Sequence, residues 1–96
     1  MAAFESVNIT SFTNEIESRG GWVLNFAGSA RRRGVPDLLA CVPIRGCGMF
    51  VAVEVKRAGL KATARQRVEM ARIRRAGGVA FECDSIDQLR EVLDAL

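Results

Sequence analysis

The stretch PDLLACVPIRGCGMFVAVEVK, residues 36–56, decides the expected fold. Two apolar runs flank a segment rich in glycine and proline, which predicts strands over Pro36–Val42 and Met49–Lys56 joined by a turn over Pro43–Gly48. An acid stands near the start of the first run, and an acid and a lysine close the second. In an antiparallel hairpin the start of one strand lies beside the end of the other. We therefore expect these charged groups to meet.

The charged groups at the hairpin ends are Asp37, Glu54 and Lys56. Side chains alternate between the two faces of a strand, so Glu54 and Lys56 share one face with Ala52, while the valines of the same run share the other. Asp37 should approach Glu54, and two adjacent carboxylates repel each other unless a cation lies between them. The pattern indicates a divalent-metal site that cleaves phosphodiesters. The alternative is a surface salt bridge between Lys56 and either acid.

The rest of the chain predicts three helices and two further strands. Apolar spacing and glycine pairs predict helices over Phe4–Arg19, Thr63–Ala76 and Ser85–Leu96, and strands over Trp22–Ala27 and Val79–Cys83. The order is α-β-β-β-α-β-α, and the helix between the last two strands implies that they are parallel. The sequence therefore predicts one small α/β domain, residues 1–96, with a mixed sheet.

Glu5 lies on the apolar stripe of the first helix, four residues before Ile9 and seven before Phe12. A carboxylate aimed toward the core needs a partner, because an unpaired buried charge is costly. We therefore include Glu5 in the candidate site. The alternative is a first-turn acid favoured by the helix dipole. Glu15 and Glu17 lie off the stripe and are expected to be solvated.

Gln66 shares the inward stripe of the second long helix with Met70 and Ile73, so it also belongs to the candidate site. The alternative is a capping box with Thr63, three residues earlier. Both roles could hold in part, but one side-chain amide cannot easily serve both, and the site role is preferred.

Basic residues gather in the middle of the chain, between residues 31 and 75, and acids prevail from residue 82 onward. Most of the basic residues are arginines, which suit bidentate contact with phosphate, and a helix N-terminus favours the same anion. A solvated charge run is the alternative. The expected partner is DNA, contacted through its phosphates, since no motif for base readout is present. The candidate DNA-binding residues are Arg31, Arg32, Arg33, Lys61, Arg65 and Arg67.

Several classes of protein are excluded by composition. The chain has no histidine and no tyrosine, which excludes a Ser-His-Asp triad, a His-ligated zinc site and a tyrosine nucleophile. The three cysteines lack a CxxC spacing and are expected to be reduced and mostly buried, as in a cytosolic protein. Aromatic residues such as Trp22 and Phe50 fall in apolar patterns typical of a core. No signal peptide or membrane-length apolar run is evident, so a cytoplasmic location is expected.

The motifs, taken in order, resemble the VRR-NUC domain, a branch of the PD-(D/E)xK nuclease superfamily. The matching elements are Glu5, Arg33-Gly34-Val35-Pro36-Asp37, Glu54-Val55-Lys56, Gln66 and Gly77-Gly78, which span nearly the whole chain. One departure precedes Gln66, where residues 61–65 read KATAR and lack the more usual acid.

The resemblance implies a restriction-endonuclease-like core and a Mg²⁺- or Mn²⁺-dependent DNA endonuclease. It implies that Asp37, Glu54 and the Val55 carbonyl bind the metal, with Lys56 as the catalytic lysine. Glu5, counted among the metal ligands, and Gln66 would complete the site.

Stand-alone members of this size are typical of bacteria and bacteriophages, and the family is similar in core fold to Holliday-junction resolvases. We therefore expect a homodimer that cuts branched DNA in the cytoplasm of a bacterial or phage-infected cell. The alternatives are a nuclease for flaps, nicks or single strands, and a non-catalytic DNA-binding module.

Overall fold

The structure is a computed structural model that describes residues 2–27, 33–56 and 60–96, without the side chains of residues 2–7. The order α-β-β-β-α-β-α predicted from the sequence is confirmed. The elements are α1 (Ala2–Ser18), β1 (Trp22–Asn25), β2 (Leu38–Ile44), β3 (Cys47–Val55), α2 (Ala64–Arg75), β4 (Val79–Cys83) and α3 (Ile86–Asp94).

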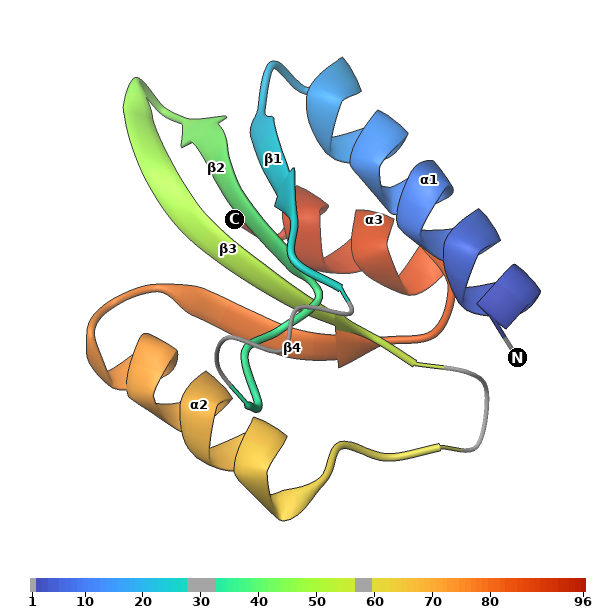
Figure 1. Cartoon of the computed structure of the whole chain (residues 1–96). Coiled ribbons are helices and arrows are strands. Elements are labelled where there is room, and N and C mark those ends of the chain that lie inside the picture. The colour runs from blue at the N-terminus through green and yellow to red at the C-terminus, as the bar shows by residue number, and fades with distance from the viewer. Residues whose placement is uncertain (1, 28–32, 57–59) are drawn as a thin grey trace.

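The four strands form one mixed sheet in the order β1-β2-β3-β4. The first three strands are antiparallel neighbours, whereas β3 and β4 run parallel, as the intervening helix implied. Helices α1 and α3 cover one face of this sheet and α2 lies on the other (Figure 1). Within the described residues, no helix has the length and apolar character needed to cross a membrane.

Strand β3 divides the core because its side chains alternate between the two faces. Its valines join the larger cluster, which includes Phe12 and Ile16 of α1 and Leu89 and Leu93 of α3. On the opposite face Ala52 packs with the residues Ala62, Met70 and Ala80 in a smaller cluster beneath α2. The predicted division of β3 into a valine face and a face that carries Glu54 is therefore confirmed.

The β2–β3 turn is tighter than the sequence predicted. It contains only Arg45 and Gly46, both with positive φ (52° and 83°), as two-residue hairpin turns require. Pro43, expected in the turn, instead lies inside β2 and pairs with Gly48. Because β1 pairs with β2 only as far as Cys41, the proline lies where β2 is an edge strand and needs no donor on that side.

Strand β1 ends at Asn25, two residues earlier than predicted. The side-chain Oδ1 of Asn25 accepts a hydrogen bond from the Ala27 backbone N–H at 2.9 Å. An asparagine that bonds its own backbone two residues on forms a local turn, which competes with a continued strand.

Helix α2 covers only part of its face of the sheet. Trp22, Cys41 and Phe50 form one row across β1, β2 and β3 on this face, and all three are exposed. The expectation of core aromatics is therefore wrong at Trp22 and Phe50, and that of mostly buried cysteines is wrong at Cys41 and at Cys47, which begins β3 next to the turn. The row of Trp22, Cys41 and Phe50 is exposed because α2 packs against β3 and β4 and leaves β1 uncovered.

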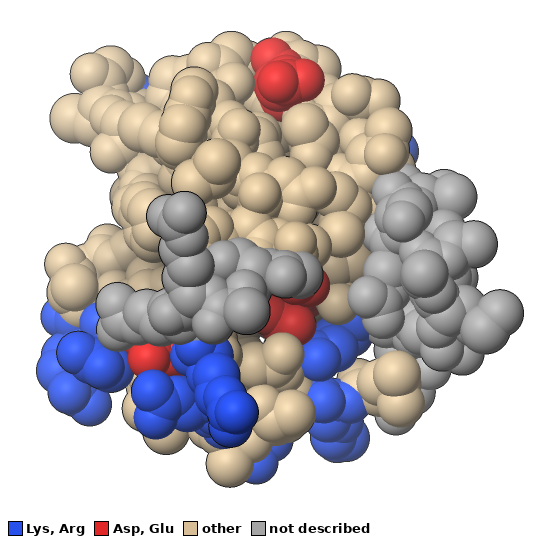
Figure 2. Space-filling model, in the orientation of Figure 1, with Lys and Arg blue, Asp and Glu red and all other residues tan. Residues whose placement is uncertain are grey.

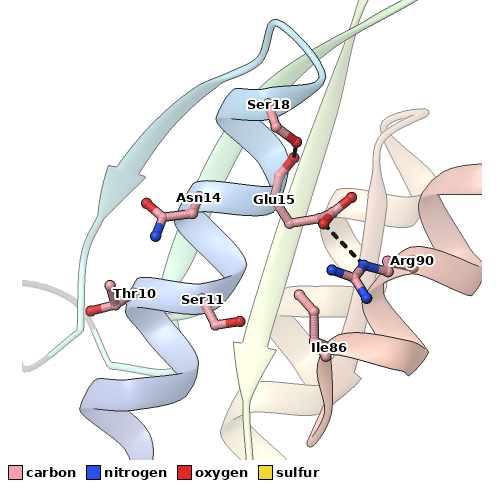
Figure 3. Close-up of a pocket in the computed structure, with 7 residues that line it drawn as sticks. All are labelled: Thr10, Ser11, Asn14, Glu15, Ser18, Ile86 and Arg90. Atoms are coloured by element: carbon pink, nitrogen blue, oxygen red, sulfur yellow. Dashed lines mark hydrogen bonds and ion pairs between the residues drawn. The ribbon is translucent and has the colours of Figure 1, made fainter.

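An ion-pair cluster joins α1 to α3 on the other side of the sheet. Glu15, expected to be solvated, accepts hydrogen bonds from Arg19 and from Arg90 of α3, both at 3.0 Å. Figure 3 shows Glu15 and Arg90 pointing toward each other. Both residues line a groove of about 670 Å³. Glu17 is exposed, as predicted.

Candidate active site

Asp37 lies at the start of β2, directly beside the end of β3. The register pairs Leu38 with Val53, which brings Asp37 opposite Glu54. The Asp37 Oδ2 atom accepts a hydrogen bond from the Val55 backbone N–H at 3.0 Å. The predicted approach of Asp37 to Glu54 is therefore confirmed, and a main-chain donor of β3 fixes the aspartate.

Glu54 is 3% exposed, and its two carboxylate oxygens differ. The Oε2 atom lies 3.3 Å from Lys56 Nζ and accepts a hydrogen bond from Gln66 Nε2 at 2.9 Å. The Oε1 atom is buried and has no hydrogen-bond partner among the described residues. Glu54 is thus held through one oxygen while the other remains available.

The pKa of Glu54 is raised to about 7, first by burial and then by the charge of Asp37, while Lys56 acts in the opposite direction. Desolvation and a second carboxylate both disfavour the ionised form. The single positive charge of Lys56 does not balance the two negative charges of Asp37 and Glu54 when both are ionised.

Gln66 serves both of the roles that the sequence analysis treated as competing. Its Oε1 accepts from the Thr63 backbone N–H at 2.9 Å, and Thr63 Oγ1 accepts from the Gln66 N–H at 3.2 Å, completing a capping box. Its Nε2 donates to Glu54. The oxygen and the nitrogen of the amide make separate contacts, so the contacts expected for both roles are present together.

Glu5 lies near the beginning of α1, and its side chain lies outside the described part of the structure. One turn later, Asn8 Nδ2 donates to the Asp84 carbonyl at 3.5 Å, just after β4. Because β4 pairs with β3 through Glu54 and Glu82, this contact brings the N-terminal part of α1 to the site edge of the sheet.

Gly34 allows the segment before β2 to pass close to the start of α2. Its φ is +80°, and a Cβ at this position would lie 2.7 Å from Arg65 Cγ and 2.8 Å from the Arg65 carbonyl oxygen. Only glycine combines this backbone conformation with so close an approach. The Gly-Val-Pro-Asp motif therefore joins the helix that carries Gln66 to the strand that follows Asp37.

The comparison with solved structures identifies this arrangement. A chain described as "VRR_NUC domain" superposes with a TM-score of 0.78 at 29% sequence identity, and the match covers 95% of each chain. The match supports the VRR-NUC resemblance over nearly the whole chain. No family model matches the sequence, and no curated protein does. The VRR-NUC assignment supports a nuclease-type domain and the expected α/β fold.

The basic surface of the protein lies around α2. Figure 2 shows lysine and arginine side chains gathered over the part of the molecule where α2 lies. Of the predicted DNA-binding residues, Arg31 and Arg32 lie outside the described residues, and the other four are exposed, namely Arg33, Lys61, Arg65 and Arg67. The prediction omitted Arg72, Arg74 and Arg75, which are exposed in the last turn of α2 and extend the basic surface.

A hollow of about 270 Å³ opens beside Lys56. Lys61 and Glu82 are among its lining residues. The sequence analysis missed Glu82, although its alternation with Ala80 along β4 puts it on the α2 face of the sheet. The sequence could not show that Glu82 pairs with Glu54, because the register between β3 and β4 is not encoded locally.

The oxygen atoms of the candidate site fit a hard divalent cation. The described residues contain no group of three or more acidic, histidine or cysteine side chains that could hold a metal ion. Mg²⁺ needs fewer, because it takes one or two carboxylates and completes its shell with water and phosphate oxygens. The buried, unpartnered Oε1 of Glu54 next to Asp37 is the feature that a cation would satisfy.

Proposed function

We propose that the chain is a metal-dependent, structure-selective DNA endonuclease that cuts branched DNA, such as four-way junctions, as a homodimer. Residues 1–96 would act as one nuclease domain. The observation that carries the proposal is the difference between the two carboxylate oxygens of Glu54. Its Oε2 contacts Lys56 and Gln66, while the buried Oε1 has no hydrogen-bond partner among the described residues. A carboxylate with a purely structural role has no reason to leave a buried oxygen without a donor.

Asp37, Glu54, the Val55 carbonyl and Glu5 would hold Mg²⁺ or Mn²⁺. When bound, such an ion supplies a Lewis acid and lowers the pKa of a bound water. The Val55 N–H orients Asp37, and Gln66 orients Glu54, so both carboxylates are positioned before the ion arrives. Preorganised ligands reduce the cost of assembling the site.

Lys56 would act on the reacting phosphate. Its Nζ lies 3.3 Å from Glu54 Oε2, and its side chain is 17% exposed at the edge of a hollow that opens to the surface. From there Lys56 can orient or deprotonate the attacking water, or stabilise the negative charge that develops on the phosphorane.

The basic residues Arg33, Lys61, Arg65 and Arg67, together with Arg31 and Arg32, would bind DNA phosphates. Such binding carries no sequence information by itself, which agrees with a nuclease that selects DNA by shape. The logarithm of the affinity should therefore fall steeply and linearly with the logarithm of salt concentration.

Dimerisation would bring two sites to one junction, where two cuts are needed. A chain of 96 residues buries a modest core, and the exposed apolar side chains Trp22, Leu24 and Phe50 on one sheet face support self-association. Light scattering at micromolar concentration tests this part of the proposal, and a monomer mass would reject the dimer. We further propose that the enzyme acts in the cytoplasm of a bacterial or phage-infected cell, which agrees with three free cysteines.

The decisive experiment is a cleavage panel of four-way junction, flap, nicked duplex, intact duplex, single strand and RNA, each with Mg²⁺, Mn²⁺ or chelator. We expect metal-dependent cutting that is strongest on the junction. Preference for flaps, nicks or single strands would support the nuclease activity but contradict the proposed junction substrate. DNA binding without cutting under either metal would instead identify a non-catalytic binding module.

A further inference from the structure

Ala62, just before α2, is 4% exposed, and both its backbone N–H and its carbonyl oxygen are hydrogen-bonded to side chains. Its backbone N–H donates to Glu82 Oε1 at 2.6 Å, and its carbonyl accepts from Arg67 Nη1 at 2.5 Å. Both partners are charged, and charge-assisted hydrogen bonds are short and strong. Ala62 is therefore clamped between a side chain of β4 and a side chain of α2.

The clamp is connected to the candidate site through two further hydrogen bonds. Thr63 follows Ala62 and donates its N–H to Gln66 Oε1, while Gln66 Nε2 donates to Glu54 Oε2. Glu82 itself pairs with Glu54 in the parallel β3–β4 ladder and lies on the same face. A continuous path of contacts thus leads from Glu82, through the start of α2, to the carboxylate in the adjacent strand.

The clamp also determines where Lys61 lies. Lys61 directly precedes Ala62 and lines the hollow beside Lys56, as does Glu82. Holding Ala62 against β4 therefore keeps two lysines at one hollow, where a phosphate would meet both.

We propose that Glu82 is a positioning residue of the nuclease site: by holding the Ala62 N–H, it sets Gln66 against Glu54 and Lys61 beside Lys56. The inference rests on the proposed nuclease function and adds a residue that acts without touching substrate or metal. What Glu82 contributes is a hydrogen-bond acceptor at a fixed point, so a neutral acceptor of the same length should replace it.

A double-mutant cycle tests whether Glu82 acts through Gln66. Glu82→Ala and Gln66→Ala should each lower kcat for junction cleavage by about tenfold with little change in KM, and the loss in the double variant should be clearly smaller than the product of the two single losses. Glu82→Gln should stay within about threefold of the parent protein. The matched control is Glu91→Ala, because Glu91 is an exposed glutamate of α3 whose side chain makes no polar contact with another described residue.

Three results would overturn the inference: parent-like kcat in Glu82→Ala, multiplicative losses in the double variant, or a Gln variant as impaired as the Ala variant. If Glu82→Ala does not fold, Glu82→Asp keeps the charge but retracts the acceptor by one methylene. Its kcat should then fall, and an unchanged kcat would also overturn the inference.

Amide hydrogen exchange separates failure of the inference from failure of the proposed function. In metal-free protein without DNA, the Ala62 amide should exchange at least about tenfold faster in Glu82→Ala than in the parent or in Glu82→Gln. If the parent cuts no DNA, the nuclease proposal fails while this measurement still reports on the clamp. If the parent cuts DNA and Ala62 exchange is unchanged in Glu82→Ala, the inference fails alone.

Discussion

Two glutamates on opposite sides of the sheet have opposite surroundings. Glu15 of α1 has each oxygen paired with an arginine, Arg19 at 3.0 Å and Arg90 at 3.0 Å. The hydrogen bond from Arg19 and then that from Arg90 lower the pKa of Glu15. Glu54 has one lysine, an adjacent carboxylate and a buried oxygen without a partner among the described residues, and its pKa is raised to about 7.

The difference separates a structural carboxylate from a candidate catalytic one. Glu15 has its charge balanced by the protein, and its ion pairs tie α1 to α3. Glu54 lacks such balance, so its surroundings suit a cation from solution. Perturbed carboxylates that lack protein partners cluster at functional sites, whereas saturated ones support the fold.

The largest effect is expected for Lys56→Ala. Loss of the ammonium group should lower kcat by about 10²- to 10⁴-fold, the range for a group that takes part in proton transfer. DNA affinity should change little, because other basic residues carry the phosphate contacts. Single-turnover cleavage and a binding titration measure the two effects. Glu15→Gln is the matched control and should cut at the parent rate. Equal losses of cleavage rate in both variants would contradict the assignment of a structural role to the Glu15 region and a catalytic role to the Glu54 region.

A smaller effect is expected on metal binding when Asp37 is changed to Asn. Removing even an outer partner of a metal ligand costs about 10- to 100-fold in affinity, so losing a ligand itself should cost at least tenfold. Calorimetric titration with Mn²⁺ measures this loss directly. A parent-like titration curve in Asp37→Asn would show that the ion does not bind there.

The raised pKa of Glu54 predicts a pH-dependent response to metal. A carboxyl whose folded pKa lies above its unfolded value of about 4.5 contributes stability below the unfolded pKa and loses it as pH rises through about 7. Since a metal needs the ionised carboxylate, Mn²⁺ should raise the melting temperature more at pH 8 than at pH 6. Glu54→Gln should remove this difference; an equal metal shift at both pH values in the parent would contradict the prediction.

The smallest effect is expected for Glu15→Gln. Arg90 is 53% exposed, so solvent screens its pair, and the loss of stability should be about 1 kcal/mol. The lowered pKa of Glu15 means that this contribution is present above the unfolded pKa and is lost as pH falls through the folded one. Urea denaturation at pH 7 and pH 3 measures it, and a difference between parent and variant that persists at pH 3 would assign the effect to packing.

Local patterns in the sequence predicted the elements and the meeting of Asp37 with Glu54, because alternation and hairpin pairing follow from residue order alone. Sequence could not reveal which oxygen of Glu54 is held, since that depends on the height of α2 above the sheet. It also preferred one role for Gln66, whereas the amide makes the contacts of both.

Errors arose where neighbouring elements decide exposure. Trp22 and Phe50 are apolar, but α2 does not extend over them. Glu15 lies off the apolar stripe of α1, but α3 brings Arg90 to it across a sequence separation that no local pattern records. Glu82 escaped notice because the register of a parallel pair joined by a helix is not encoded locally.

The exposed Trp22 on β1 gives the protein a built-in optical reporter. It is the sole tryptophan, and the chain has no tyrosine. With 60% of its surface in solvent, its fluorescence should emit near the wavelength of free indole, and a blue shift would register any molecule that covers β1. Titrations with junction DNA, and dilution series of the protein alone, can therefore be followed without an attached dye.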